Sequence, residues 1–233
     1  MKPHLKIDIV SDVVCPWCYI GKRRLEKAIK EIEENYTFTI NYLPFQLSPD
    51  TPAEGENTKE RLIAKFGGEA RYHQIIKQVS LVAAGEGLNF DLENQTISPN
   101  THLLHRLAWY AQQQGKQLEM MEALFQAYFE QRMDLSKIEN ILTLAINVGL
   151  DAERVRALLV SDEGKEAIDQ LLYQNHLMGV SGVPYYIIND KYAISGAQPT
   201  KLFLKPSPKL PKKHLYKHPP KEPFAILKQA CAD

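Results

Sequence analysis

The spacing of apolar residues divides the chain into strand-like ends and a helical middle, and this division constrains the fold most. Residues 5–10 alternate in hydrophobicity, as in a β-strand. From Pro16 the apolar residues take helical spacing, and Asn35 is expected to end that helix. Residues 37–45 alternate again. A strand, a helix and a strand in this order predict two parallel strands joined by a right-handed crossover.

Helical periodicity dominates the middle of the chain. Residues 48–60 form a polar, turn-rich loop, and residues 58–178 show only helical spacing, so no strand is expected there. Two short apolar runs then flank Asn189–Asp190, which predicts a β-hairpin. We therefore expect an α/β fold in which both chain ends form one mixed sheet, with a large all-helical insertion over one edge. The expected divisions are the sheet domain (1–50 and 161–205), the inserted helices (51–160) and a tail (206–233).

Charge and the N-terminal sequence narrow the class of protein. The 28 basic and 28 acidic residues balance, so nothing points to nucleic acid or a membrane surface as partner. Lys6 and Asp8 interrupt the apolar run that a signal peptide would need, and no segment approaches a membrane span. We therefore expect a cytoplasmic protein, in which thiols stay reduced and disulfides are transient.

The tail has a composition of its own. Six prolines between residues 206 and 223 forbid a continuous helix, and residues 201–233 carry eight lysines against two acidic residues. Such a segment is expected to be extended or disordered. The alternative is contact with an acidic surface or nucleic acid, which needs more aromatic residues than Tyr216.

Two of the three cysteines form the motif Cys15-Pro16-Trp17-Cys18 where the first strand meets the first helix. If Cys15 lies at the first helical turn, unpaired backbone N–H groups and the helix dipole favour its thiolate, the form that attacks a disulfide. Pro16 suits the first helical position. Cys18 is expected to be the shielded resolving thiol one turn further, and Trp17 a contact surface for substrate. The motif therefore predicts a redox-active dithiol.

Two alternatives to redox chemistry stay open at this stage. A structural zinc site needs four ligands, but the third cysteine is Cys231 in the tail, and no histidine pair lies at ligand spacing near the motif. An inert buried pair is the other alternative. Pro184 favours the redox interpretation. It follows a glycine-rich turn and precedes a strand, where the Val183–Pro184 bond is a candidate for the cis form.

The chain resembles a known family over about residues 5–204. Proteins with a DsbA-like thioredoxin fold share the order of five segments found here, "SDVVCPWCYIGKRRLE", "LPFQLSPD", "NTHLLHRL", "LFQAYFEQRMDLS" and "GVSGVPYYIINDKYAISGAQP". The sequence is most similar to the FrnE-like branch, which is related to 2-hydroxychromene-2-carboxylate isomerases and kappa-class glutathione transferases. The resemblance implies a thioredoxin fold with a helical insertion, and thiol–disulfide oxidoreductase activity with Cys15 as nucleophile and Cys18 as resolver.

The resemblance also implies which residues contact substrate. Val183 and Pro184 would match a cis-proline loop that pairs with an extended substrate backbone. The expected substrate-binding set is Pro16, Trp17, Phe45, Gln46, Asn100, His105, Val183 and Pro184. The alternative for Phe45 is a place in the core, and for His102 and His105 a polar position at its edge. Asp12 is expected to influence the thiol of Cys15 or relay a proton, with a capping or surface role as the alternative.

The expected partners follow from this chemistry. Substrates would be disulfide-containing proteins or small molecules, no metal or nucleotide is needed, and glutathione would serve as reductant or co-substrate. A homodimer is expected because relatives often pair. In the isomerase and transferase relatives a serine replaces the nucleophilic cysteine and glutathione binds there, so a glutathione-dependent isomerase or transferase is the runner-up function. A thiol-bearing scaffold with an idle motif is the third. The chain departs from its relatives after Pro199, because Pro206 stops the helix begun at residues 201–205.

Overall fold

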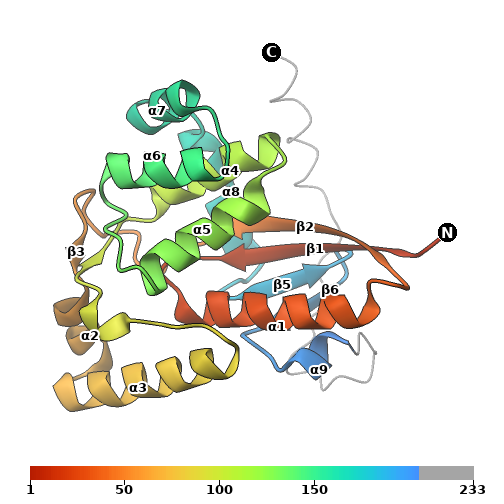
Figure 1. The fold of residues 1–233 in the computed structure, drawn as a ribbon, viewed down its shortest axis with the longest axis horizontal. Helices are drawn as coiled ribbons and strands as arrows, with labels where there is room; N and C mark the ends of the chain where they lie inside the picture. Colours follow the sequence, from red (N-terminus) through yellow and green to blue (C-terminus); the bar gives the residue numbers. More distant parts are fainter. Residues whose placement is uncertain (205–233) are drawn as a thin grey trace.

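The protein is described by a computed structural model, which describes residues 1–204. Its centre is a four-stranded sheet in the order β2-β1-β5-β6 (Figure 1). The central strand β1 (His4–Ser11) pairs in parallel with β2 (Thr37–Pro44) and antiparallel with β5 (Tyr185–Ile188). Strand β6 (Tyr192–Ser195) continues antiparallel from β5. The mixed sheet predicted from the two chain ends is therefore confirmed.

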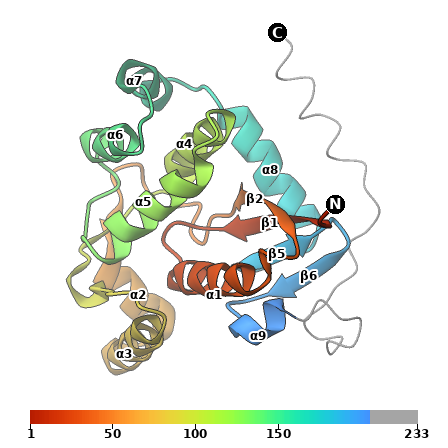
Figure 2. The same ribbon diagram turned by 45° about the vertical axis from the view of Figure 1, so that its right-hand side comes forward.

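Alternation along the strands assigns each sheet face to different helices. Ile7 and Ile9 of β1 share a buried cluster with Leu25 of α1 (Pro16–Ile32) and Phe203 of α9 (Thr200–Phe203). Val10 of β1 lies in the cluster of the opposite face, against which α8 (Lys165–Leu177) packs. Figure 2 shows the sheet between α1 with α9 and α8. Since successive side chains of a strand point to opposite faces, apolar residues of β1 are buried on both faces of the sheet.

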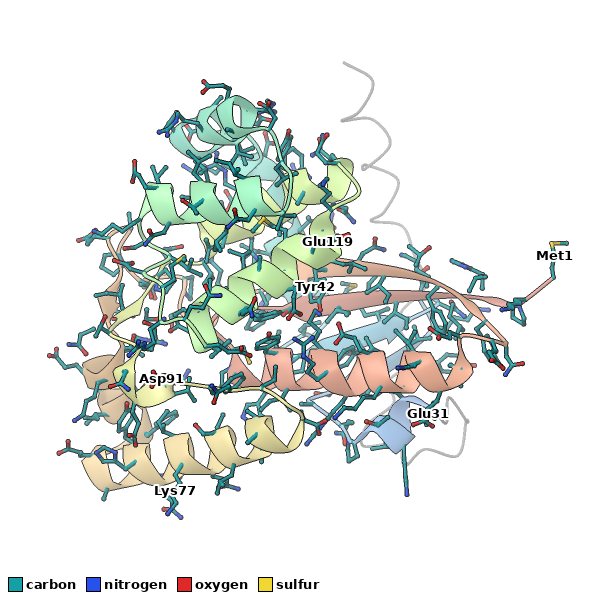
Figure 3. The ribbon with its side chains drawn as sticks, in the orientation of Figure 1. Met1, Glu31, Tyr42, Lys77, Asp91 and Glu119 are labelled. Carbon is teal, nitrogen blue, oxygen red and sulfur yellow. The ribbon has the colours of Figure 1, made fainter. Side chains whose placement is uncertain are left out.

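The inserted helices run along the β2 edge of the sheet and beyond α1. Apolar residues at helical spacing form their shared core, including Leu107, Leu124, Phe125, Leu142 and Leu158. Side chains fill the space between these helices and the sheet, and Tyr42 marks where β2 meets α5 (Figure 3). The elements are α2 (Thr58–Phe66), α3 (Glu69–Gly85), a 3-10 turn η1 (Leu92–Asn94), α4 (His102–Gln113), α5 (Gln117–Phe129), α6 (Ile138–Asn147) and α7 (Ala152–Val160).

The expectation of a strand-free middle is wrong in one place. Strand β3 (Glu56–Asn57) pairs antiparallel with β4 (Ile97–Ser98), far along the chain. Two residues are too few to show alternation, so the sequence pattern gives no signal for either strand. The first helix also ends at Ile32 rather than at Asn35.

The hairpin and the chain end complete the comparison with the predicted fold. Asn189 and Asp190 join β5 to β6 with φ of 50° and 55°, the left-handed conformation that Asn and Asp tolerate best. The predicted hairpin is therefore confirmed. Within residues 1–204, no helix is long and apolar enough to cross a membrane. The predicted Lys/Pro-rich tail (206–233) lies outside the described residues.

Candidate active site

The Cys-x-x-Cys motif lies where β1 turns into α1. The backbone N–H of Cys15 donates to Asp12 O at 3.1 Å, closing the turn, and Cys15 is the N-cap residue with an extended backbone (φ −93°, ψ 110°). Pro16 takes the first helical position, as predicted, since that position needs no N–H. The positive end of the α1 dipole therefore lies at the first cysteine, although no helix N–H donates to its sulfur.

Both thiols are free and both are buried, although the sequence led us to expect only Cys18 to be shielded. Cys15 is 4% exposed and Cys18 2%. Burial raises the pKa of the Cys18 thiol well above its ordinary value, and the neighbouring Cys15 adds to this rise. The hydroxyl of Ser11 and the backbone N–H of Asp12 act in the opposite direction on that pKa. Cys18 is thus held as a neutral thiol beneath Cys15.

A cis-proline loop faces the first thiol. The Val183–Pro184 bond is cis, which confirms the geometry predicted from the sequence. The Cys15 thiol donates a weak hydrogen bond to the Val183 carbonyl, with 3.6 Å between sulfur and oxygen. Trp17, 37% exposed, is the large apolar side chain of the motif that reaches the surface. The structure therefore brings Cys15, Cys18, Val183 and Pro184 together.

Gly21 permits this arrangement, and sequence reasoning missed it. A side chain at Gly21 would overlap Tyr186 Oη and lie 3.2 Å from Pro184 Cγ. Since Gly21 lies on α1, it lets the helix that carries both cysteines approach β5 and the cis-proline loop closely. A glycine three residues after Cys18 was the available signal, because glycine inside a helix is unfavourable without a packing reason.

The other predicted substrate contacts meet in the loop that follows β2. His105 on α4 is buried, and its Nε2–H donates to Phe45 O at 2.8 Å. Gln46 Nε2 donates to Asn100 Oδ1 at 3.0 Å, and Asn100 Nδ2 donates to Thr51 O at 2.7 Å. These four residues are thus close together, and the contacts seen for their polar groups hold the loop against α4.

Asp12 belongs to the same network. Its Oδ2 accepts from the backbone N–H of Leu47 at 2.7 Å, and its Oδ1 lies 3.7 Å from His105 Nε2. Asp12 is fully buried, so the surface alternative is wrong. His102, the other histidine of α4, points elsewhere and pairs with Asp169 of α8 at 2.9 Å. Asp12 and His105 therefore attach the loop to the start of the cysteine motif.

An ionic cluster fixes α1 to the inserted helices. Glu122 of α5 accepts hydrogen bonds from Tyr19, Lys22 and Arg23 of α1. Burial pushes the pKa of Glu122 upward, but hydrogen bonds from Arg23 and Lys22 outweigh burial and leave that pKa below its ordinary value. The inserted helix α5 thus holds α1, the helix at whose start the two cysteines lie. Within residues 1–204, no group of three or more His, Cys, Asp and Glu side chains is placed to hold a metal ion.

Comparison with known proteins agrees with this geometry. The family model described as DSBA-like thioredoxin domain matches residues 6–205. The uncharacterized protein YwbO of Bacillus subtilis strain 168 is 26% identical over 208 residues, which cover 88% of this chain and 96% of YwbO.

Two solved structures share the fold. The probable DsbA oxidoreductase of Streptomyces coelicolor has a TM-score of 0.80 and 28% identity, over 86% of this chain and 87% of that one. A 2-hydroxychromene-2-carboxylate isomerase has a TM-score of 0.63 and 17% identity, over 85% of this chain and 91% of that one. At the latter identity the likeness concerns the fold alone.

Proposed function

Because this chain belongs to the DsbA-like thioredoxin family, we propose that it is a thiol–disulfide oxidoreductase that uses Cys15 and Cys18 as its redox pair. One observation carries the proposal most directly. Two free thiols lie within the first turn of α1, the first of them as N-cap residue against the carbonyl before a cis proline. This arrangement places the first thiol at the positive end of the α1 dipole and the second thiol one turn behind it, within reach of the first.

The reaction proceeds by two exchanges. The thiolate of Cys15 attacks one sulfur of the substrate disulfide, that S–S bond breaks, and the other sulfur leaves as a thiolate and takes up a proton. Cys18 then loses its proton and attacks Cys15 Sγ, and the remaining substrate sulfur leaves. Two electrons have passed to the substrate, and the Cys15–Cys18 disulfide has formed. Two glutathione molecules return the enzyme to its dithiol form and become glutathione disulfide.

The surroundings of the dithiol support a disulfide-containing protein or small molecule as substrate. Cys15 is only 4% exposed, so a partner disulfide must approach its sulfur closely, beside Trp17 and the Val183–Pro184 loop. Phe45 and Gln46 lie on the loop that Asp12 and His105 hold at the start of the motif. In a cytoplasmic setting the glutathione pool would favour reductase or isomerase work over net oxidation.

The test of the proposal compares two activities of the same preparation. We expect reduction of insulin disulfides with glutathione as reductant, and no turnover of a chromene carboxylate isomer. Cys231 is replaced by serine throughout, so that only the proposed pair contributes thiols. Chromene isomerisation that survives Cys18→Ala, without insulin reduction, would favour the glutathione-dependent isomerase instead, since that chemistry needs no second thiol.

A further inference from the structure

The cis-proline loop is hydrogen-bonded to residues 196–198, the segment that follows β6. The N–H of Gly196 donates to Pro184 O at 2.8 Å. Gly196 has a φ of 79°, a conformation that glycine adopts at little cost. A movement of this segment would therefore change the position of Pro184, whose neighbour Val183 faces the Cys15 thiol.

Helix α1 holds both of these segments, at two places along its length. At its start the Cys15 thiol meets Val183 O. Nine residues later, Arg24 Nη1 donates to Ala197 O at 2.6 Å. Between the two, Gly21 lets Ala197 lie close to the helix, since a Cβ added to Gly21 would be 3.4 Å from Ala197 Cβ. Arg24 thus ties the segment after β6 to the helix at whose start the two cysteines lie.

The inserted helix α3 fixes the orientation of the Arg24 side chain. Glu86, the C-cap residue of α3, accepts from Arg24 Nε and from Lys27 Nζ, each at 2.6 Å. Burial pushes the pKa of Glu86 upward, but hydrogen bonds from Lys27 and Arg24 outweigh burial and leave that pKa below its ordinary value. Glu86 is therefore an ionised acceptor at neutral pH. Since Arg24 also contacts Ala197, one side chain of α1 connects the insertion to the segment after β6.

These two bonds suit the fork of an arginine. The Nε–H and Nη1–H groups of one planar guanidinium point in different directions, toward the Glu86 carboxylate and the Ala197 carbonyl. A lysine ends in a single nitrogen on a flexible chain, which fixes no angle between two acceptors. If Arg24 is lost, Glu86 keeps Lys27 as a partner. The Ala197 carbonyl, in contrast, loses the donor that ties it to α1.

We propose that Arg24 is a positioning residue that holds the cis-proline loop against Cys15, and that Glu86 keeps Arg24 in the orientation this requires. The role rests on the proposed function, in which the Val183–Pro184 backbone binds the substrate while Cys15 attacks the substrate disulfide. Arg24 itself touches neither the thiols nor the loop, and it acts through residues 196–198. Its loss should therefore weaken substrate binding more than it slows the exchange.

The kinetics of insulin reduction with glutathione test this role in the Cys231→Ser protein. Arg24→Gln should raise KM by about three- to tenfold, which corresponds to the net strength of one hydrogen bond, and should lower kcat by less. Arg24→Lys keeps the charge beside Glu86 without the second donor direction, so KM should stay raised. Glu86→Gln leaves Arg24 in place, and it should raise KM by a smaller factor. Lys27→Gln, which removes the other ion pair of the same carboxylate, should leave KM unchanged.

Amide hydrogen exchange gives a second measurement, one that does not depend on activity. The Gly196 N–H is protected by its bond to Pro184 O, so loosening of residues 196–198 should make it exchange faster. We expect faster exchange of this amide in Arg24→Gln and unchanged exchange in Lys27→Gln.

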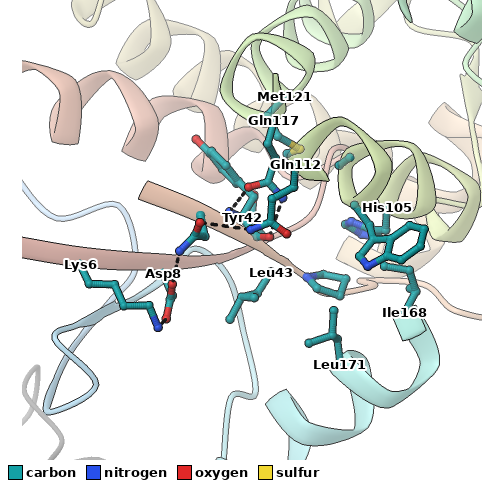
Figure 4. A pocket seen from close by; sticks show the side chains of 15 residues that line it. Lys6, Asp8, Tyr42, Leu43, His105, Gln112, Gln117, Met121, Ile168 and Leu171 are labelled. Atoms are coloured by element: carbon teal, nitrogen blue, oxygen red, sulfur yellow. Dashed lines mark hydrogen bonds and ion pairs between the residues drawn. The ribbon is translucent and has the colours of Figure 1, made fainter. Parts of the chain in front are cut away.

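Lys6→Gln is the control for a general loss of stability. Lys6 pairs with Asp8 at 2.7 Å, and both line a cavity of about 200 Å³ along the β2 edge of the sheet (Figure 4). Neither cysteine nor the Val183–Pro184 loop is among the residues that line this cavity. Lys6→Gln should therefore leave both KM and the exchange of the Gly196 amide unchanged.

Several results would overturn the role of Arg24 while leaving the dithiol chemistry intact. They are an unchanged KM in Arg24→Gln, an equal rise of KM in Lys27→Gln or Lys6→Gln, and faster exchange at Gly196 without a higher KM. A Cys231→Ser protein that does not reduce insulin would contradict the proposed function instead. The exchange of the Gly196 amide in Arg24→Gln would then decide alone whether Arg24 holds the loop.

Discussion

The sheet domain and the inserted helices contribute to the candidate site in different ways. The sheet side supplies the proposed reacting groups, since Cys15 and Cys18 lie at the start of α1 and Pro184 precedes β5. The insertion supplies groups that hold those elements. His105 of α4 donates to the loop after β2, and Glu122 of α5 accepts from α1. Changes on the sheet side should therefore affect chemistry or the packing of α1, whereas changes in the insertion should affect positioning and stability.

Loss of the first thiol should give the largest effect. Cys15→Ser removes the group that attacks the substrate disulfide, so insulin reduction should fall at least about 1,000-fold. Cys231→Ser, which changes a cysteine outside the described residues, is the matched control and should keep full activity. Comparable losses in both variants would contradict the proposal that Cys15 is the attacking thiol.

Two glycine replacements, one on α1 and one in the inserted helices, compare how closely the two regions are packed through the free energy of unfolding. Gly21→Ala places a methyl group against Tyr186 and Pro184, so the free energy of unfolding should fall by about 1–3 kcal/mol. Gly85 on α3 has nothing within 4 Å of an added methyl, and Gly85→Ala should stabilise the protein by about 0.5 kcal/mol. Urea unfolding measures both. A tolerated Gly21→Ala would contradict the close packing of α1 on the cis-proline loop.

Removal of His105 should cost stability and substrate affinity more than turnover. His105→Ala removes a buried side chain and leaves the half-buried carbonyl of Phe45 without its donor, which should lower the free energy of unfolding by about 1–3 kcal/mol. A loosened loop should raise KM for insulin more than it lowers kcat. His102→Ala, on the same helix in a more exposed pair with Asp169, should change stability by at most about 1 kcal/mol. Equal effects of the two variants would count against a positioning role for His105.

The Glu122 cluster should give the smallest effect, and one that depends on pH. The pKa of Glu122 is lowered below its ordinary 4.5, so its contribution to stability is fully present above that value. The contribution is lost as pH falls through the folded-state pKa. Glu122→Gln should therefore lower the melting temperature at pH 7, and the difference from the unaltered protein should shrink below pH 4.5. Glu119→Gln, exposed on the same helix, should show no such dependence.

The parts of the site that depend on local backbone preferences could be predicted from the sequence. Proline at the first helical position, two cysteines one turn apart, and proline before a strand each have a strong local preference. The placement of the two cysteines at the start of the first helix, the cis bond and the hairpin could therefore be predicted. The two-residue strands Glu56–Asn57 and Ile97–Ser98 could not, because their pairing depends on residues about forty positions apart.

Other features of the site depend on contacts between segments that are far apart in the chain, and the sequence pattern does not show these contacts. The nearly equal burial of Cys15 and Cys18 depends on elements that return from distant parts of the chain. The bond between His105 and Phe45 joins α4 to the loop after β2. Ser11 is buried at the end of β1, and its place in the lining of a cavity follows from how α4, α5 and α8 meet the β2 edge.

The most direct test of the central claim is to trap the reaction between its two exchanges. In a Cys18→Ala, Cys231→Ser protein, a mixed disulfide formed on Cys15 cannot be resolved internally. After exposure to oxidised glutathione or a disulfide-containing protein, mass spectrometry should find one adduct per chain, attached at Cys15. The corresponding Cys15→Ala, Cys231→Ser protein should carry far less. Absence of an adduct on Cys15, or equal labelling of Cys18 when Cys15 is missing, would contradict the account.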